Sequence, residues 1–82
     1  MGVEEHRRKS RRSVRTAILT VSDTRTEKTD GSGRLIREML LEAGHSVVGY
    51  EVVREEPELI RDRLREWIGS DRIEAILVTG GT

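Results

Sequence analysis

Polar and glycine residues come directly after three apolar runs in this 82-residue sequence. Segment 22–24 (Ser-Asp-Thr) follows the first run, 54–56 (Arg-Glu-Glu) follows the second, and 79–82 (Thr-Gly-Gly-Thr) follows the third. Such runs are typical of strands buried in a parallel sheet, and ligands of such sheets bind outside the carboxyl ends of the strands. We therefore expect the three segments to converge at one edge of a sheet and to form a ligand-binding cleft.

The third segment has the residue types of an anion cradle. Gly80 and Gly81 let the backbone approach a ligand closely, and their amides, together with the hydroxyls of Thr79 and Thr82, can hold a phosphate. A Gly-Gly pair also makes ordinary turns, so spacing alone leaves both interpretations open.

A second candidate cradle lies at 30–33 (Asp-Gly-Ser-Gly), where a helix is expected to start. Ser32 is predicted to be the N-cap of that helix, while Gly31 and Gly33 turn the chain. The alternative is that this segment only caps the helix and binds nothing. The residue types are compatible with either interpretation.

Three carboxylates are expected to face the cleft, namely those of Asp23, Asp30 and Glu55. Magnesium prefers hard oxygen ligands, so these side chains can hold the metal beside the phosphates of a nucleotide. For Glu55 and Glu56 the alternative is to start the next helix, whose positive end favours acidic residues. The absence of cysteine excludes a thiolate metal site and a disulfide framework.

The elements that must position these segments alternate between strand and helix. Apolar runs predict strands over 16–21, 47–53 and 73–78. Between them, apolar residues recur at helical spacing in two segments, the first ending at Gly44 and the second starting with Pro57 in its first turn. This order implies two right-handed crossovers and a parallel sheet with helices on its faces. The predicted fold class is α/β.

Two parts of the chain are expected to differ in organisation. Residues 1–14 are predicted to be a basic, disordered arm, and residues 15–82 the N-terminal half of a larger α/β domain, because the turn at 79–82 normally leads into a further helix. Residues 1–15 carry six basic and two acidic side chains, so the net charge of +0 combines a basic arm with an acidic body. No apolar run reaches the roughly 18 residues of a membrane span. We expect a cytoplasmic protein that binds neither membranes nor nucleic acid.

Four segments together resemble a known family. They are 17–24 (AILTVSDT), 29–33 (TDGSG), 52–57 (VVREEP) and 77–82 (LVTGGT). In this order and spacing they are similar to the molybdenum cofactor biosynthesis protein B (MoaB/Mog) family. The resemblance runs from about residue 15 to residue 82 and covers the first half of the family's domain.

The resemblance implies a three-layer α/β fold with a mostly parallel sheet and helices on both faces, of which this chain holds strand-helix-strand-helix-strand. It also implies molybdopterin binding and, in the members with the activity, transfer of AMP from Mg-ATP to molybdopterin. Molybdopterin and Mg-ATP are therefore the expected ligands. Members assemble as trimers or hexamers, so the full-length protein is expected to be a homo-oligomer.

Matched residue by residue, the resemblance assigns a site. Glu55 stands where the family has an acid implicated in metal and nucleotide handling, and it is the expected catalytic residue. Asp30 and Glu55 are the expected magnesium ligands. The residues expected to bind molybdopterin or the nucleotide are Thr20, Ser22, Asp23, Asp30, Ser32, Gly33, Thr79, Gly80, Gly81 and Thr82.

Departures from the family pattern bear on the activity. The family has an aspartate where this chain has Glu55, and prolines where it has Arg34 and Arg54. The longer Glu55 side chain changes the reach and angle of the carboxylate toward a metal. A second acidic residue of the family lies beyond the glycine turn, so the 82-residue chain alone is expected to be inactive.

Two other function classes compete with the adenylyltransferase. A phosphoacceptor receiver domain has a similar fold but requires an aspartate at the end of the third strand, where this chain has Thr79. A non-catalytic molybdopterin-binding or oligomer-forming scaffold remains open.

In the adenylyltransferase, the phosphate of molybdopterin attacks the α-phosphate of ATP and pyrophosphate leaves. That reaction requires no protein nucleophile, which fits a chain without cysteine.

Overall fold

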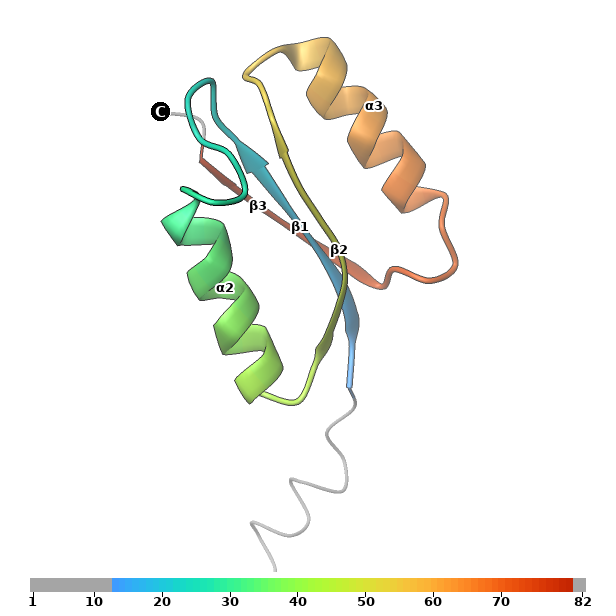
Figure 1. The fold of residues 1–82 in the computed structure, drawn as a ribbon. Coiled ribbons are helices and arrows are strands. Elements are labelled where there is room, and N and C mark those ends of the chain that lie inside the picture. The colour runs from blue at the N-terminus through green and yellow to red at the C-terminus, as the bar shows by residue number, and fades with distance from the viewer. Residues whose placement is uncertain (1–12, 81–82) are drawn as a thin grey trace, which may run out of the picture.

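Strands and helices alternate along residues 13–80, which are the residues that the computed structural model describes (Figure 1). The elements in chain order are β1 (Arg15–Val21), α2 (Gly31–Glu42), β2 (Ser46–Val53), α3 (Pro57–Ile68) and β3 (Ala75–Gly80). The predicted α/β class and order of elements are confirmed. Most of the predicted basic arm lies outside the described residues, but Val14 already contacts the fold, where its N–H donates to His45 Nδ1 at 3.0 Å.

The three strands form one parallel sheet in the order β2-β1-β3. The last residue of β1, Val21, stands beside Val53 of β2 and Gly80 of β3. The carboxyl ends of all three strands therefore meet at one edge, as the apolar runs predict. An irregularity in β2 after Val47 shifts the register, so that Ala17 stands beside Gly49. A Cβ at Gly49 would lie only 3.2 Å from Cβ of Ala17, so glycine keeps this contact close.

The two helices lie on opposite faces of the sheet (Figure 1), and β1 provides the core of both sides. Ala17, Leu19 and Val21 pack toward Trp67 of α3, with further partly buried residues around them. The alternate positions of β1 face α2, where Thr20 bonds to the residue that starts the helix. Because β1 is buried on both faces, its sequence is a near-continuous apolar run rather than an alternating one.

Helix α2 starts differently from the prediction. Its N-cap is Asp30 rather than Ser32, because an Asp30 carboxylate oxygen accepts the N–H of Gly33 at 3.1 Å. Ser32 lies inside the first turn of the helix and is exposed. The helix is followed by Gly44 at a φ of 91°, as expected for a left-handed residue after a helix end.

Strand β3 also differs, because it continues through Thr79 to Gly80 where a turn was predicted. Gly80 has a φ of 97°, and a Cβ at this position would overlap the carbonyl oxygen of Val21. A glycine is thus required by the close approach of β3 to β1 at the carboxyl edge. The Gly80 position predicted for ligand contact is also a structural requirement.

Apolar side chains remain exposed along α2, α3 and β3. Leu35 and Met39 of α2 are 57% and 61% exposed, and Ile68 of α3 is 73% exposed. A groove of about 340 Å³ lies between α2 and β3 and is lined by Ile36, Met39, Leu40, Ala43, His45 and Leu77. Within residues 13–80 no helix is long and apolar enough to cross a membrane.

Candidate functional site

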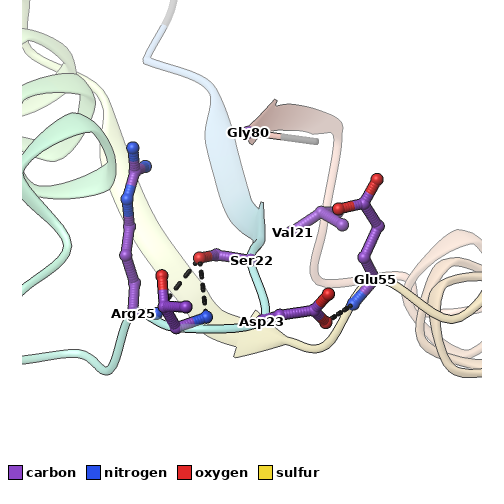
Figure 2. Close-up of a pocket in the computed structure, with 7 residues that line it drawn as sticks. Val21, Ser22, Asp23, Arg25, Glu55 and Gly80 are labelled. Carbon is purple, nitrogen blue, oxygen red and sulfur yellow. Dashed lines mark hydrogen bonds between the residues drawn. The ribbon is translucent and has the colours of Figure 1, made fainter. Parts of the chain in front are cut away.

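A pocket of about 290 Å³ lies at the carboxyl ends of the strands (Figure 2). It is lined by Val21, Ser22, Asp23, Thr24, Arg25, Glu55 and Gly80. The loop after β1, the loop after β2 and the end of β3 each contribute residues to it. The predicted convergence of the three segments is therefore confirmed, and it brings together Ser22, Asp23, Glu55 and Gly80.

Ser22 fixes the loop that follows β1. Its N–H donates to Val53 O at 2.8 Å, so the residue continues the pairing between β1 and β2. Its Oγ accepts the N–H of Thr24 at 3.2 Å and of Arg25 at 3.1 Å, as Figure 2 shows. Since a hydroxyl both donates and accepts, the Ser22 hydroxyl can hold the loop and still donate its hydrogen to a ligand.

Asp23 joins the loops after β1 and β2. One of its carboxylate oxygens accepts the N–H of Glu55 at 2.8 Å, and both residues are exposed. In Figure 2, Glu55 and Arg25 stand on opposite sides of the pocket, with Ser22 and Asp23 between them. Two carboxylates and one guanidinium therefore surround this pocket, which suits a polar ligand with an anionic group or a bound cation.

For Glu55 and Glu56, the alternative prediction was that they start the helix after β2. Glu56 does so by its position alone. Glu56 is the N-cap of α3, but its side chain makes no cap hydrogen bond. It pairs instead with Arg54, whose Nη2 lies 2.7 Å from Glu56 Oε2. Pro57 is the first residue of α3, as expected for a residue without an N–H. The Glu55 side chain lines the pocket instead of capping the helix.

Asp30 is fully buried and lies beside the pocket rather than on its wall. Its Oδ2 accepts the hydroxyls of Thr20 and Tyr50, each at 2.6 Å, and its Oδ1 accepts the Gly33 N–H. Nη1 of Arg25 lies 3.7 Å from Oδ1. The structure thus surrounds Asp30 with protein donors and does not bring it together with Glu55 at the pocket.

These contacts decide the charge of the network. Burial alone would raise the pKa of Asp30, but the hydrogen bonds from Thr20, Tyr50 and Gly33 and the charge of Arg25 lower it overall. Burial, followed by the hydrogen bond to Asp30, raises the pKa of Tyr50 to about 12. Asp30 is therefore an anion and Tyr50 a neutral donor at neutral pH.

The oxygen chemistry of the pocket suits magnesium better at Glu55 than at Asp30. Glu55 and Asp23 present carboxylates at the pocket wall, whereas both oxygens of Asp30 already accept hydrogen bonds. Among residues 13–80 no group of three or more histidine, cysteine, aspartate or glutamate side chains is arranged to hold a metal. Of the two expected magnesium ligands, Glu55 therefore lies at the pocket wall and Asp30 does not.

The other described residues that were predicted to bind a ligand do not line the pocket. Thr20 and Gly33 are buried against Asp30, and a Cβ at Gly33 would lie 2.8 Å from Thr20 Oγ1. Ser32 is exposed on α2, and Thr79 is half-buried within β3; neither lines the pocket. Gly81 and Thr82 lie outside the described residues.

Two residues of the site and its support were not predicted: Arg25 on the pocket wall, and Tyr50 behind it. Arg25 has a sequence signal, since it directly follows the polar segment after β1 and carries a charge. For Tyr50 the signal is the strand pairing. Tyr50 stands beside Ile18, which lies on the same sheet face as Thr20. The signal for Tyr50 depends on the pairing of β2 with β1, which no local pattern in the sequence gives.

Comparisons with known proteins identify the family of the chain. Residues 17–82 match the family described as "Probable molybdopterin binding domain". The chain is 49% identical over 82 residues to molybdenum cofactor biosynthesis protein B of Halalkalibacterium halodurans, covering all of this chain and 48% of that protein. The namesake from Escherichia coli K12 is 47% identical over 69 residues, which cover 84% of this chain and 41% of that protein.

A solved structure has the same fold. The crystal structure of a molybdenum cofactor biosynthesis protein B superposes with a TM-score of 0.83 at 44% identity, covering 87% of this chain and 44% of that chain. The chain spans about half the length of the curated relatives it matches. With a family match over residues 17–82 and a shared fold, the chain belongs to the family described as "Probable molybdopterin binding domain".

Proposed function

We propose that the protein acts in molybdenum cofactor biosynthesis and binds molybdopterin at the pocket of Ser22, Glu55 and Gly80. The observation that carries the proposal is that three segments far apart in the sequence supply one polar pocket at the carboxyl edge of the sheet. Its volume of about 290 Å³ is near the lower end for small-molecule sites. The description of the matching family supports molybdopterin as the ligand, and the names of the relatives support the role in cofactor biosynthesis.

Binding would use the groups that the loops already fix in place. The Ser22 hydroxyl is held by two backbone amides and donates its hydrogen to a ligand acceptor. The Gly80 backbone lies against Val21, where a Cβ would overlap Val21 O, so the tight packing of β3 on β1 fixes this part of the pocket wall. These groups are pre-organised, which lowers the entropy cost of binding.

We further propose that the full-length protein transfers AMP to molybdopterin. A phosphate oxygen of molybdopterin forms a bond to the α-phosphorus of ATP, and the bond from that phosphorus to the bridging oxygen breaks. The electron pair leaves with pyrophosphate. Glu55 would hold the magnesium of Mg-ATP, which neutralises charge on the phosphates. The protein contributes position and electrostatics, with no covalent protein intermediate.

Calorimetric titration of the full-length protein with molybdopterin tests the binding proposal. Ser22→Ala combined with Gly81→Val should lower the affinity at least tenfold, which corresponds to about 1.4 kcal/mol. Ser70→Ala is a matched control, because Ser70 Oγ also accepts a backbone N–H, at 3.2 Å from Arg72, but outside the pocket. Equal affinity of the double variant and the wild type would contradict the proposal.

Pyrophosphate release from Mg-ATP in the presence of molybdopterin tests the transfer. Glu55→Gln keeps the size of the side chain and removes its charge, so it should lower the rate about 100-fold. Glu58→Gln is the control, since Glu58 lies in the first turn of α3 and does not line the pocket. An unchanged rate in Glu55→Gln would remove Glu55 from the mechanism.

A non-catalytic molybdopterin-binding or oligomer-forming scaffold is the second candidate. Two observations favour it. Glu55 replaces the aspartate that the resemblance leads one to expect, and the exposed Leu35, Met39 and Ile68 provide apolar surface for assembly. Molybdopterin binding without any pyrophosphate release by the wild-type protein would select this candidate.

A further inference from the structure

Arg25 is the only cationic side chain among the described residues that line the pocket. Its backbone N–H is held by Ser22 Oγ at 3.1 Å, and its guanidinium lies 3.7 Å from Asp30 Oδ1. Figure 2 shows the side chain extending away from Asp23 and Glu55 along the opposite side of the pocket. Arg25 is therefore held at its backbone and at its guanidinium, and it lies away from the carboxylates of Asp23 and Glu55.

The partner of Arg25 is an unusual carboxylate. Asp30 is completely buried, while the Arg25 side chain is 38% exposed. Thr20 and Tyr50 donate to one oxygen of Asp30 and Gly33 donates to the other, so the carboxylate cannot turn toward the solvent. A buried charge retains much of its field because little water screens it. Asp30 thus holds Arg25 from the side opposite the solvent.

Most donors of Arg25 remain available to a ligand. A guanidinium carries five N–H donors in a rigid fork, and the contact with Asp30 joins only Nη1 to one oxygen. The fork matches the geometry of a phosphate, to which two donors can bond at once. Asp23 and Glu55 repel an anion from the rest of the wall, so the anionic group of a ligand is directed to the Arg25 side.

We propose that Arg25 binds the phosphate of the ligand and that Asp30 is a positioning residue that holds the Arg25 guanidinium at the pocket. This inference rests on the proposed molybdopterin binding and adds a phosphate-specific contact to it. The alternative is that Arg25 only neutralises the buried Asp30, in which case it affects stability and not the choice of ligand.

The test compares two ligands that differ in the phosphate alone. The full-length protein is titrated with the stable oxidised pterin monophosphate obtained from molybdopterin and with the same pterin after removal of the phosphate. Arg25→Gln should bind the phosphorylated pterin 10- to 100-fold more weakly and the dephosphorylated pterin with less than threefold change. Arg25→Lys should restore part of the lost affinity. Arg37→Gln, the same charge change on α2 outside the pocket, should alter neither affinity.

A double-mutant cycle tests the role of Asp30. In the background that keeps Arg25, Asp30→Asn should weaken binding of the phosphorylated pterin. In the Arg25→Gln background it should have no phosphate-specific effect, because it acts through Arg25. Tyr50→Phe, which removes one donor to Asp30 and keeps the ring, should show the same pattern more weakly and serves if Asp30→Asn does not fold.

The outcomes separate this inference from the proposed function. If the wild type binds neither pterin, the proposed function and this inference both fail. If it binds both and Arg25→Gln weakens them equally or not at all, the phosphate contact of Arg25 is wrong while the proposed function stands. A loss from Asp30→Asn that is equal for both pterins and in both backgrounds would overturn the positioning role.

Discussion

At the scale of the residue, the hydrogen bonds that Asp30 accepts from Thr20, Gly33 and Tyr50 determine where α2 starts beside the pocket. We call these residues the Asp30 network. Ser32 and Asp30 are both residue types that cap helices well, and the prediction of Ser32 followed from local spacing alone. Asp30 takes the position because it also bonds to Thr20 of β1 and Tyr50 of β2. Those partners are distant in sequence, so no local pattern identifies them.

Asp30→Asn should lower the free energy of unfolding by about 2 to 4 kcal/mol, because it removes a buried charge that accepts three hydrogen bonds and leaves Arg25 without its partner. Urea denaturation at neutral pH measures the difference. Asp62→Asn is the control, since Asp62 is exposed on α3 and its change should stay within about 0.5 kcal/mol. Equal stability of the two variants would show that the network contributes little.

The same network predicts a dependence of stability on pH. The pKa of Asp30 lies below its ordinary value of 3.8, so its contribution is present above the unfolded pKa and is lost as the pH falls through the lower, folded pKa. The difference in unfolding free energy between the wild type and Asp30→Asn should therefore be constant above about pH 5 and shrink below about pH 4. Urea denaturation over a series of pH values checks this. A difference that grows toward low pH would contradict the lowered pKa.

At the scale of the element, the strands and helices were predictable and their exact boundaries were not. Apolar runs and helical spacing predict all five elements, because burial on both faces of β1 and one face of each helix leaves its pattern in the sequence. The end of β3 was predicted two residues early. Thr79 and Gly80 continue the strand because they pair with Thr20 and Val21, a contact set by the fold.

Gly80→Ala should be strongly destabilising, since a Cβ would overlap Val21 O and the residue has a φ of 97°. We expect a loss of about 2 to 3 kcal/mol in unfolding free energy, measured by thermal or urea denaturation. Gly31→Ala is the matched control, because nothing lies within 4 Å of a Cβ at the start of α2. The control should be neutral or slightly stabilising. A neutral Gly80→Ala would mean that the close approach of β3 to β1 is not tight.

At the scale of the whole molecule, the sheet is covered unevenly. Apolar side chains of α2 stay exposed beside the groove to β3, while β1 is buried on both faces. The 82-residue chain should therefore enhance the fluorescence of a dye that binds apolar surface. Ile36→Gln with Met39→Gln, both in the lining of the groove, should lower this enhancement by roughly half, whereas Leu41→Gln, exposed outside the groove, should change it little. Dye fluorescence no higher than with a closed globular protein would contradict the exposure.

The central claim is that molybdopterin binds where the carboxyl ends of the strands meet. Amide chemical shifts of the isotope-labelled full-length protein, followed during titration with molybdopterin, test it most directly. We predict saturable shifts that are largest at Ser22, Arg25 and Glu55 on the pocket wall. Saturable shifts confined to groove residues such as Met39 and Leu77, with the pocket amides unchanged, would contradict the claim.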